Sequence, residues 1–527
     1  MKRMSRFVKW QLPLLALLLG PLLSQPAQAQ STYNAASCVE SAVQAAFALE
    51  QASKADGDII SIPACSATSW SSPLSISPAN SLTIQGQSST TGTCAPAGTC
   101  APTDNTNITF GNGVQLTVDI AAGKTFRLTG ISFTFSGSSA QYGNLTFNCG
   151  GAQLRLDHNH LNDEVNGGHT VQPDQCTGVL DHNFWDSTDQ GNLFFIQPTI
   201  DNGGSETDGE SNYTWTQPEN FGSSGFLFVE NNFFQNGAFL FDCDFGGRIV
   251  FRYNTGSTNT RIQTHGTGSG AQRRGCRAME IYNNTFTYST SPNTNSFAFL
   301  VDYESGPLMF WGNTITGFVL LLRQQEVRAD NATYSQTPTP NGFGYCGTDF
   351  NGTGSNWDKN SNSGTGYPCL DQVGRGAGQM LTGSFPSLKN SSTGTIAWPN
   401  QALVPTYAWG NTLNTNNFAQ NHFWQNEESP ARVTENVDYY LQLPNVDEST
   451  TFNGTKGIGQ GLAAAKPSTC SPAVGWWGTD TQTLYLCTST NSWTAGYAPY
   501  TYPHPLVTGQ STQNPPAPPT NLAASVQ

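Results

Sequence analysis

Three carboxylates occupy one position of a repeated segment in this 527-residue chain, at Asp157, Asp181 and Glu230. Each stands two residues before an asparagine. If the segments stack, the carboxylates lie about 5 Å apart and repel one another unless a cation lies between them or one stays protonated. Oxygen ligands without sulfur suit Ca²⁺. We therefore predict a calcium site here, with Asp242 as a fourth candidate ligand; the alternative is a solvated polar face without function.

A basic cluster follows within the segment THGTGSGAQRRGCRAMEIYNN, residues 264–284. In an acidic protein, a local cluster of basic residues indicates a candidate functional site, because arginine guanidinium groups bind carboxylates well. Its alternative role is to form structural ion pairs with Asp242, Asp244 and Asp302. The candidate catalytic residues from this cluster and the strand before it are Arg274, Arg252, His265 and Glu280.

The repeat position of the three carboxylates continues as a series along the chain: Thr129, Asp157, Asp181, Glu230, Arg252, Tyr282 and Trp311. Aromatic side chains that face outward can stack on sugar rings. The candidate substrate-binding residues are Arg155, Arg277, Tyr282 and Trp311. His158 and His182, which follow two of the carboxylates, are expected to pack at turns and not to bind a ligand.

Six segments position these residues, and all share the pattern apolar, any, apolar, polar, any, Asn, any, apolar. They are LRLDHNHL, GVLDHNFW, LFVENNFF, IVFRYNTG, MEIYNNTF and LMFWGNTI, which begin at residues 154, 178, 227, 249, 279 and 308. A period-two strand in every repeat predicts a β-solenoid. Inward asparagine amides can bond from coil to coil and so remain satisfied when buried; alternatively, the asparagines are only turn formers.

A second series of strands follows the asparagine turns, and each of these strands ends in polar residues. The polar residues at the strand ends are Gln172, Gln197, Asp242, His265, Asp302 and Arg323. Loops of varied length lead from there to the next coil, and long loops on one side of a rigid solenoid usually build a binding cleft.

The domain boundaries follow from changes in pattern. Residues 37–53 carry apolar residues at helical spacing, and a helix there would cap the first coil. We expect the solenoid with its cap over 30–326, an irregular C-terminal region packed on it over 327–508, and a Pro-rich tail or linker over 509–527.

Residues 1–29 are typical of a secretory signal peptide, with four basic residues, an apolar run and a small-x-small site at 27–29. The twelve cysteines of an exported chain predict disulfides, most simply between sequence neighbours. A net charge of −14 excludes general nucleic-acid binding. We expect a monomer that is secreted or displayed at the cell surface and not inserted in a membrane.

LRLDHNHLND and RRGCRAMEIYNNTF resemble two motifs of the pectate-lyase-like superfamily of right-handed parallel β-helix proteins. The resemblance implies that fold for roughly residues 38–325. It also implies that outward acidic residues bind Ca²⁺ and that an arginine removes the proton α to a uronate carboxyl group. Asp157, Asp181 and Glu230 would then hold the metal, and Arg274 or Arg252 would be the base.

Three functions stay open at this point. The first is a Ca²⁺-assisted lyase that cleaves a uronate-containing polysaccharide by β-elimination. The second is an inverting glycoside hydrolase, because carboxylates two coils apart would be about 9.5 Å apart. The third is a surface adhesin or glycan-binding protein without catalysis.

Overall fold

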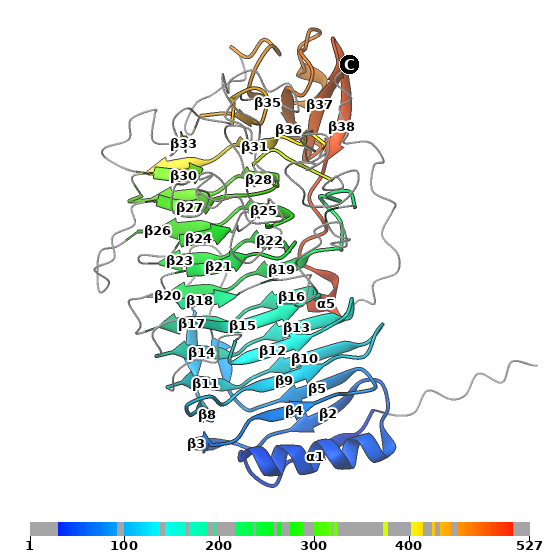
Figure 1. Ribbon diagram of the computed structural model, residues 1–527, viewed down its shortest axis with the longest axis vertical. Coiled ribbons are helices and arrows are strands. Elements are labelled where there is room, and N and C mark those ends of the chain that lie inside the picture. Colours follow the sequence, from blue (N-terminus) through cyan, green and yellow to red (C-terminus); the bar gives the residue numbers. More distant parts are fainter. Residues whose placement is uncertain are drawn as a thin grey trace, which may run out of the picture.

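The computed structural model describes the strands and turns of most of the chain. The described residues are 30–91, 100–136, 143–164, 168–187, 193–196, 198, 215, 217–235, 239–257, 261–264, 275–288, 299–318, 320–324, 371, 373–377, 402–414, 424–426, 433–443 and 451–509. Figure 1 shows these residues wound into a tall stack of coils.

Three parallel sheets, A, B and C, run along the stack, and each coil contributes one strand to each sheet over most of its length. Sheet A contains β1 (Thr32–Asn34), β2 (Asp58–Ser61), β5 (Leu82–Gln85), β10 (Thr125–Thr129), β13 (Gln153–Asp157), β16 (Thr177–Asp181), β19 (Leu227–Glu230), β22 (Arg248–Arg252), β25 (Ala278–Tyr282), β28 (Leu308–Trp311), β31 (Thr406–Trp409) and β34 (Tyr439–Leu441). Sheet B contains β3 (Cys65–Trp70), β8 (Thr106–Phe110), β11 (Ser132–Phe135), β14 (His160–Asp163), β17 (Phe184–Ser187), β20 (Phe233–Gln235), β23 (Thr255–Ser257), β26 (Thr285–Thr287), β29 (Thr314–Thr316) and β32 (Thr412–Asn414). Sheet C contains β4 (Leu74–Ile76), β9 (Leu116–Asp119), β12 (Leu145–Asn148), β15 (Gly168–Asp174), β18 (Leu193–Ile196), β21 (Phe239–Cys243), β24 (Arg261–Thr264), β27 (Phe299–Tyr303), β30 (Leu320–Gln324) and β33 (Trp424–Asn426).

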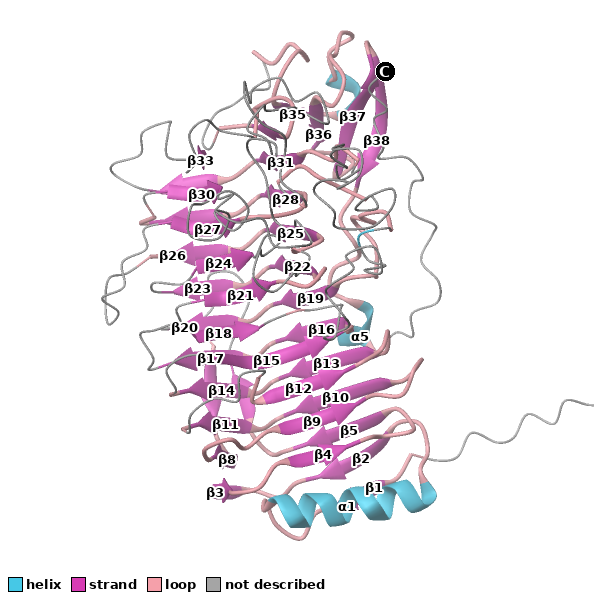
Figure 2. Cartoon of the chain, viewed as in Figure 1, coloured by secondary structure: helices cyan, strands magenta, loops and turns pink. Residues whose placement is uncertain are grey.

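The alternation of side chains fills the interior of the coil with apolar residues. Phe126, Leu154 and Leu156 of sheet A, for example, are fully buried in one continuous core, because side chains of a strand alternate between its two faces. Figure 2 shows strands throughout the stack and a helix at one end. The predicted fold, an all-β parallel solenoid with an N-terminal capping helix, is confirmed.

The predicted asparagine ladder is also confirmed. From coil to coil, the side-chain N–H of each asparagine donates to the next side-chain oxygen at 3.0–3.2 Å. The ladder consists of Asn159, Asn183, Asn232, Asn254, Asn284, Asn313 and Asn411. All seven side chains are buried, so the ladder satisfies polar groups inside the stack.

Helix α1 (Glu40–Ser53) covers the first coil with Val43, Ala46 and Phe47. At the other end the predicted boundary at residue 326 is wrong, because β31, β32, β33 and β34 extend all three sheets beyond it. The sequence around residues 406–411 repeats the pattern, but a long insertion separates it from the coil before.

A small sheet packs on the outer face of sheet A near this second end, made of β35 (Ile458–Gly461), β36 (Gly475–Gly478), β37 (Thr483–Ser489) and β38 (Ser492–Tyr497). A 3-10 turn, η2 (Ala463–Ala465), lies beside it, and a hairpin of β6 (Ser89–Thr91) and β7 (Ala101–Thr103) lies near the first coils. After β38 the chain runs back along sheet A to the short helix α5 (Pro505–Thr508), which contacts β16 (Figure 1). We call residues 497–508 the C-terminal strap.

Where both cysteines are described, four disulfides join neighbours in sequence, as predicted: Cys38–Cys65, Cys149–Cys176, Cys243–Cys276 and Cys470–Cys487. Disulfides persist in oxidising compartments, so these bonds indicate an extracellular or similarly oxidising environment. Among the described residues, no helix is long and apolar enough to cross a membrane. The predicted signal peptide and Pro-rich tail lie outside the described residues.

Candidate functional site

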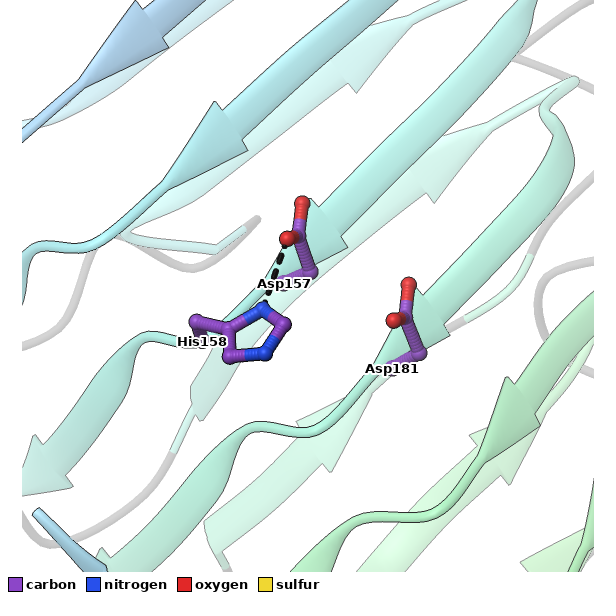
Figure 3. Close-up of side chains that lie close together, drawn as sticks. All are labelled: Asp157, His158 and Asp181. Carbon is purple, nitrogen blue, oxygen red and sulfur yellow. Dashed lines mark hydrogen bonds and ion pairs between the residues drawn. The ribbon is translucent and has the colours of Figure 1, made fainter. Parts of the chain in front are cut away.

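The predicted series of outward residues forms one column on sheet A. Thr129, Asp157 and Asp181 are paired in register on successive strands, as are Asp181, Glu230 and Arg252. Figure 3 shows Asp157 and Asp181 on neighbouring strands with His158 beside them. The premise that these side chains are vertical neighbours is therefore confirmed.

Arginines of the same face already neutralise the first two carboxylates. Arg127 donates two hydrogen bonds to Asp157, at 2.7 and 2.5 Å, and Arg155 donates two to Asp181, both at 3.1 Å. Burial opposes the ionisation of Asp157, but the hydrogen bonds from Arg127 and His158 and the charges of Arg155 and Arg127 outweigh it and lower its pKa. Both carboxylates are thus held as anions in ion pairs.

The third carboxylate, Glu230, pairs with Arg252 at 2.6 Å and accepts the backbone N–H of His504 at 2.8 Å. Burial raises the pKa of Glu230, but both contacts favour its ionised form, so we treat the pair as ionised at neutral pH. Burial disfavours the charged form of Arg252 too, yet Tyr282 and Glu230 outweigh it and raise the pKa of Arg252. A guanidinium held in this way is a poor general base.

The carboxylate oxygens of the column fit guanidinium groups and do not fit Ca²⁺. Each oxygen of Asp157, Asp181 and Glu230 accepts at least one protein hydrogen bond of 3.1 Å or less. All three side chains are fully buried, whereas Ca²⁺ takes six to eight oxygen ligands. The fourth predicted ligand, Asp242, lies on β21 of sheet C, away from this column.

The C-terminal strap covers the column. The carbonyl groups of Tyr500 and Thr501 accept hydrogen bonds from Arg252 at 2.7 and 2.9 Å. The Leu506 carbonyl accepts one from Arg155 at 2.8 Å. Burial, then the charges of Arg252 and Arg155, lowers the pKa of His504 to about 3, so this strap residue is neutral. The strap therefore supplies acceptors to the arginines without adding charge.

The two aromatic residues predicted to bind sugar instead form a core against the small sheet. The Tyr282 and Trp311 rings stack with their centroids 4.4 Å apart, and Trp311 packs on Trp477 at 5.0 Å. Tyr282 is 1% exposed and Trp311 5%. Because residues of the small sheet pack directly on both rings, the predicted stacking role is wrong for this arrangement of the chain.

Glu280, a predicted catalytic residue, also lies in this interface and is fully buried. Its carboxylate accepts the Gly222 N–H and the Tyr497 O–H, each at 2.7 Å. Burial raises the pKa of Glu280 to about 7, although both hydrogen bonds and the charge of Arg252 lower it. This carboxyl group joins sheet A to the strap and to the segment around residue 222.

Glu280→Gln is expected to stabilise the protein at alkaline pH only. A carboxyl group with a folded pKa near 7 and an ordinary value of 4.5 stabilises the fold fully below pH 4.5 and loses that contribution as pH rises through 7. The neutral amide avoids the loss, which amounts to about 3 kcal/mol. Urea unfolding of both proteins at pH 4.5 and 8.5 measures it; a stability difference that is the same at both pH values would contradict this assignment.

Arg277, predicted to bind substrate, is a buried structural residue. It pairs with Glu219 at 2.6 Å and lies over the Trp215 ring, with its guanidinium carbon 4.9 Å from the ring centroid. Arg155, likewise predicted to bind substrate, is held between Asp181 and the strap. The catalytic candidates Arg274 and His265 lie outside the described residues.

A second outward column lies on sheet C. Asp242, Gln263 and Asp302 are paired in register on β21, β24 and β27. Gln263, and not the predicted His265, holds the position between Asp242 and Asp302. Thus two carboxylates face outward two coils apart, with an amide between them.

An arginine and an aromatic ring adjoin this second column. Arg261 lies on the Phe239 ring at 3.7 Å and donates to the Gln263 side chain at 3.3 Å. Three coils below Gln263, Gln172 is paired with Thr146 in the same sheet. The sequence shows the polar residues at the ends of this ladder, but the site was predicted on sheet A because three carboxylates recur there.

No family model, curated protein or solved structure matches the chain.

Proposed function

We propose that the protein is an exported carbohydrate-active enzyme that hydrolyses a polysaccharide with Asp242 and Asp302. The in-register column of Asp242, Gln263 and Asp302 carries the proposal. Two ladder steps separate the carboxylate-bearing strands by about 9.6 Å. Side chains that lean toward each other from this spacing reach the range of about 6.5–9.5 Å that inverting glycosidases use.

The surroundings of the pair support a sugar ligand. Gln263 offers a donor and an acceptor between the carboxylates, and Arg261 adds donors on the same face. A solenoid repeats such positions every coil and so presents an extended surface to an extended chain. The resemblance of the sequence motifs to pectate-lyase-like β-helix proteins favours the same class of ligand, as an analogy at the level of the fold.

In this proposal one carboxylic acid protonates the glycosidic oxygen as the bond to the sugar breaks. The other carboxylate takes a proton from a water molecule that attacks the opposite face of the sugar ring. The products are a new reducing end and a new hydroxyl group, so atoms and protons balance. No metal enters these steps, and dependence on Ca²⁺ stays a prediction to be checked by the same assay.

Asp242→Asn and Asp302→Asn are each expected to lower the rate at least about 100-fold, because proton transfer by a positioned side chain contributes 10²–10⁴. The assay is release of reducing ends from a panel of polysaccharides, with and without Ca²⁺. Asp119→Asn is the matched control, since Asp119 lies on the same sheet and bonds only to Asn148 and Ser77 in the described residues. Unchanged rates in both variants would overturn the proposed roles.

The same digests separate two rival functions. A Ca²⁺-dependent product with the ultraviolet absorbance of an unsaturated uronate would indicate a lyase that uses residues outside the described part, such as Arg274. Binding without any cleavage would indicate an adhesin or glycan-binding protein. Asp242 and Asp302 are 2% and 4% exposed, so a polysaccharide contacts them only when the side chains around them move.

A further inference from the structure

Two histidines stand next to each other on successive coils of the solenoid. His158 and His182 directly precede the ladder asparagines and share a left-handed backbone conformation, with φ of 55° in both. Their rings stack in parallel, with centroids 5.2 Å apart and an interplanar angle of 3°. On the next coils the same turn position holds Asn231, Tyr253 and Asn283, so the described coils place imidazoles in contact at this one pair.

Each imidazole is oriented by a buried carboxylate. Nδ1 of His158 lies 2.8 Å from Asp157, and Nδ1 of His182 lies 2.9 Å from Asp181. Because each carboxylate is an acceptor fixed by an arginine, Nδ1 carries the proton and Nε2 keeps its lone pair. The side chains of His158 and His182 are 40% and 31% exposed, and their Nδ1 atoms, not their Nε2 atoms, contact the carboxylates.

We propose that His158 and His182 together bind one divalent transition-metal ion, Zn²⁺ or Cu²⁺, through their Nε2 atoms. A carboxylate behind each imidazole is the arrangement that raises the basicity of histidine ligands and fixes their tautomer. One ligand atom each of Asp157, His158 and Asp181 lies within 4.8 Å of the others, which shows how closely the two orienting groups approach. To bind one ion at about 2.0–2.1 Å from each Nε2, the two rings must turn toward each other from their parallel stack, and water completes the coordination.

This site differs from the predicted calcium site in ligand and in location. The carboxylates of Asp157 and Asp181 orient the ligands and do not coordinate, since arginines occupy their oxygens. Imidazole nitrogen also suits Zn²⁺ and Cu²⁺, whereas Ca²⁺ prefers oxygen. The ion would lie at the outer edge of the turn between sheets A and B, independent of any chemistry on sheet C.

The test is calorimetric titration of the full chain with Zn²⁺ alone, and in parallel with Cu²⁺ followed by electron paramagnetic resonance. One ion per chain is expected, with two imidazole nitrogens in the copper spectrum. His158→Asn and His182→Asn are each expected to weaken binding at least about tenfold, which is 1.4 kcal/mol, and the double variant to abolish it. Asparagine suits this position because Asn231 and Asn283 already occupy it on other coils.

Melting temperatures of the metal-free variants serve as the folding control. His160→Asn is the control for a nearby histidine, since its Nδ1 contacts Asp104 on the outer face of sheet B. If the double variant keeps its melting temperature and still binds one ion with unchanged affinity, the site is elsewhere. Absence of binding by the unaltered chain at millimolar Zn²⁺ and Cu²⁺ would also overturn the proposal.

Discussion

Asn232→Ala is expected to destabilise the protein by roughly 2–6 kcal/mol, because it leaves two buried donors without an acceptor at about 1–3 kcal/mol each. These donors are the backbone N–H of Asn183, now 2.9 Å from the Asn232 side-chain oxygen, and the Trp185 indole N–H at 3.3 Å. The Asn183 amide also loses its bond to this oxygen but keeps the Leu156 carbonyl. The Asn232 amide itself donates to the Leu180 carbonyl at 2.9 Å and to the Asn254 side chain at 3.1 Å, so removing one rung affects three coils.

Denaturant unfolding followed by tryptophan fluorescence measures this loss. Asn162→Ala is the matched control, since in the described residues the Asn162 side chain bonds only to exposed Glu164 at 3.2 Å. Its substitution should stay within about 0.5 kcal/mol. Equal effects of the two substitutions would show that the ladder contributes no more than a surface hydrogen bond.

Arg252→Met is expected to cost about 3–5 kcal/mol, because it leaves the carboxylate of Glu230 buried without its counter-ion. The same change removes the hydrogen bonds to the Tyr500 and Thr501 carbonyls that hold the strap. We therefore expect both a lower unfolding midpoint and faster chymotrypsin cleavage after Tyr500.

The double variant Glu230→Gln/Arg252→Met should recover much of this stability, since it buries no unpaired charge. Lys124→Met provides the exposed counterpart. Lys124 and Asp56 are 31% and 60% exposed, and such surface pairs contribute about 0–1 kcal/mol. If Arg252→Met costs no more than Lys124→Met, the buried pair does not hold the strap.

The sequence was sufficient to predict the fold because each repeat carries its own register. The alternation around Asn159 and its counterparts placed Asp157, Asp181 and Glu230 in one column, as the strand pairing confirms. The ion pairs on this column could also have been predicted from the sequence. Arg155 stands two residues before Asp157 and on the same face, so an arginine of one coil is well placed to reach the carboxylate of the next.

The covering of the column could not be predicted in this way. The contacts of Arg252 with Tyr500 and Thr501 join residues 248 and 249 positions apart, and no repeat relates the strap to the coils. The coil at β31 does carry the repeat, with Asn411 in the ladder, but a long insertion separates it from the coil before. The residue types of Tyr282 and Trp311 do not indicate that the small sheet packs over their side chains.

The strap has a consequence for how the molecule reaches its final form. Coils made of sequence-local contacts can assemble one after another, whereas pairings between distant residues form more slowly. The charged groups from Arg155 to Arg252 stay open to water until the strap, residues 497–508, packs on sheet A. The polar face would thus be covered only at the end of folding, and a truncation before Tyr497 would leave it exposed to water.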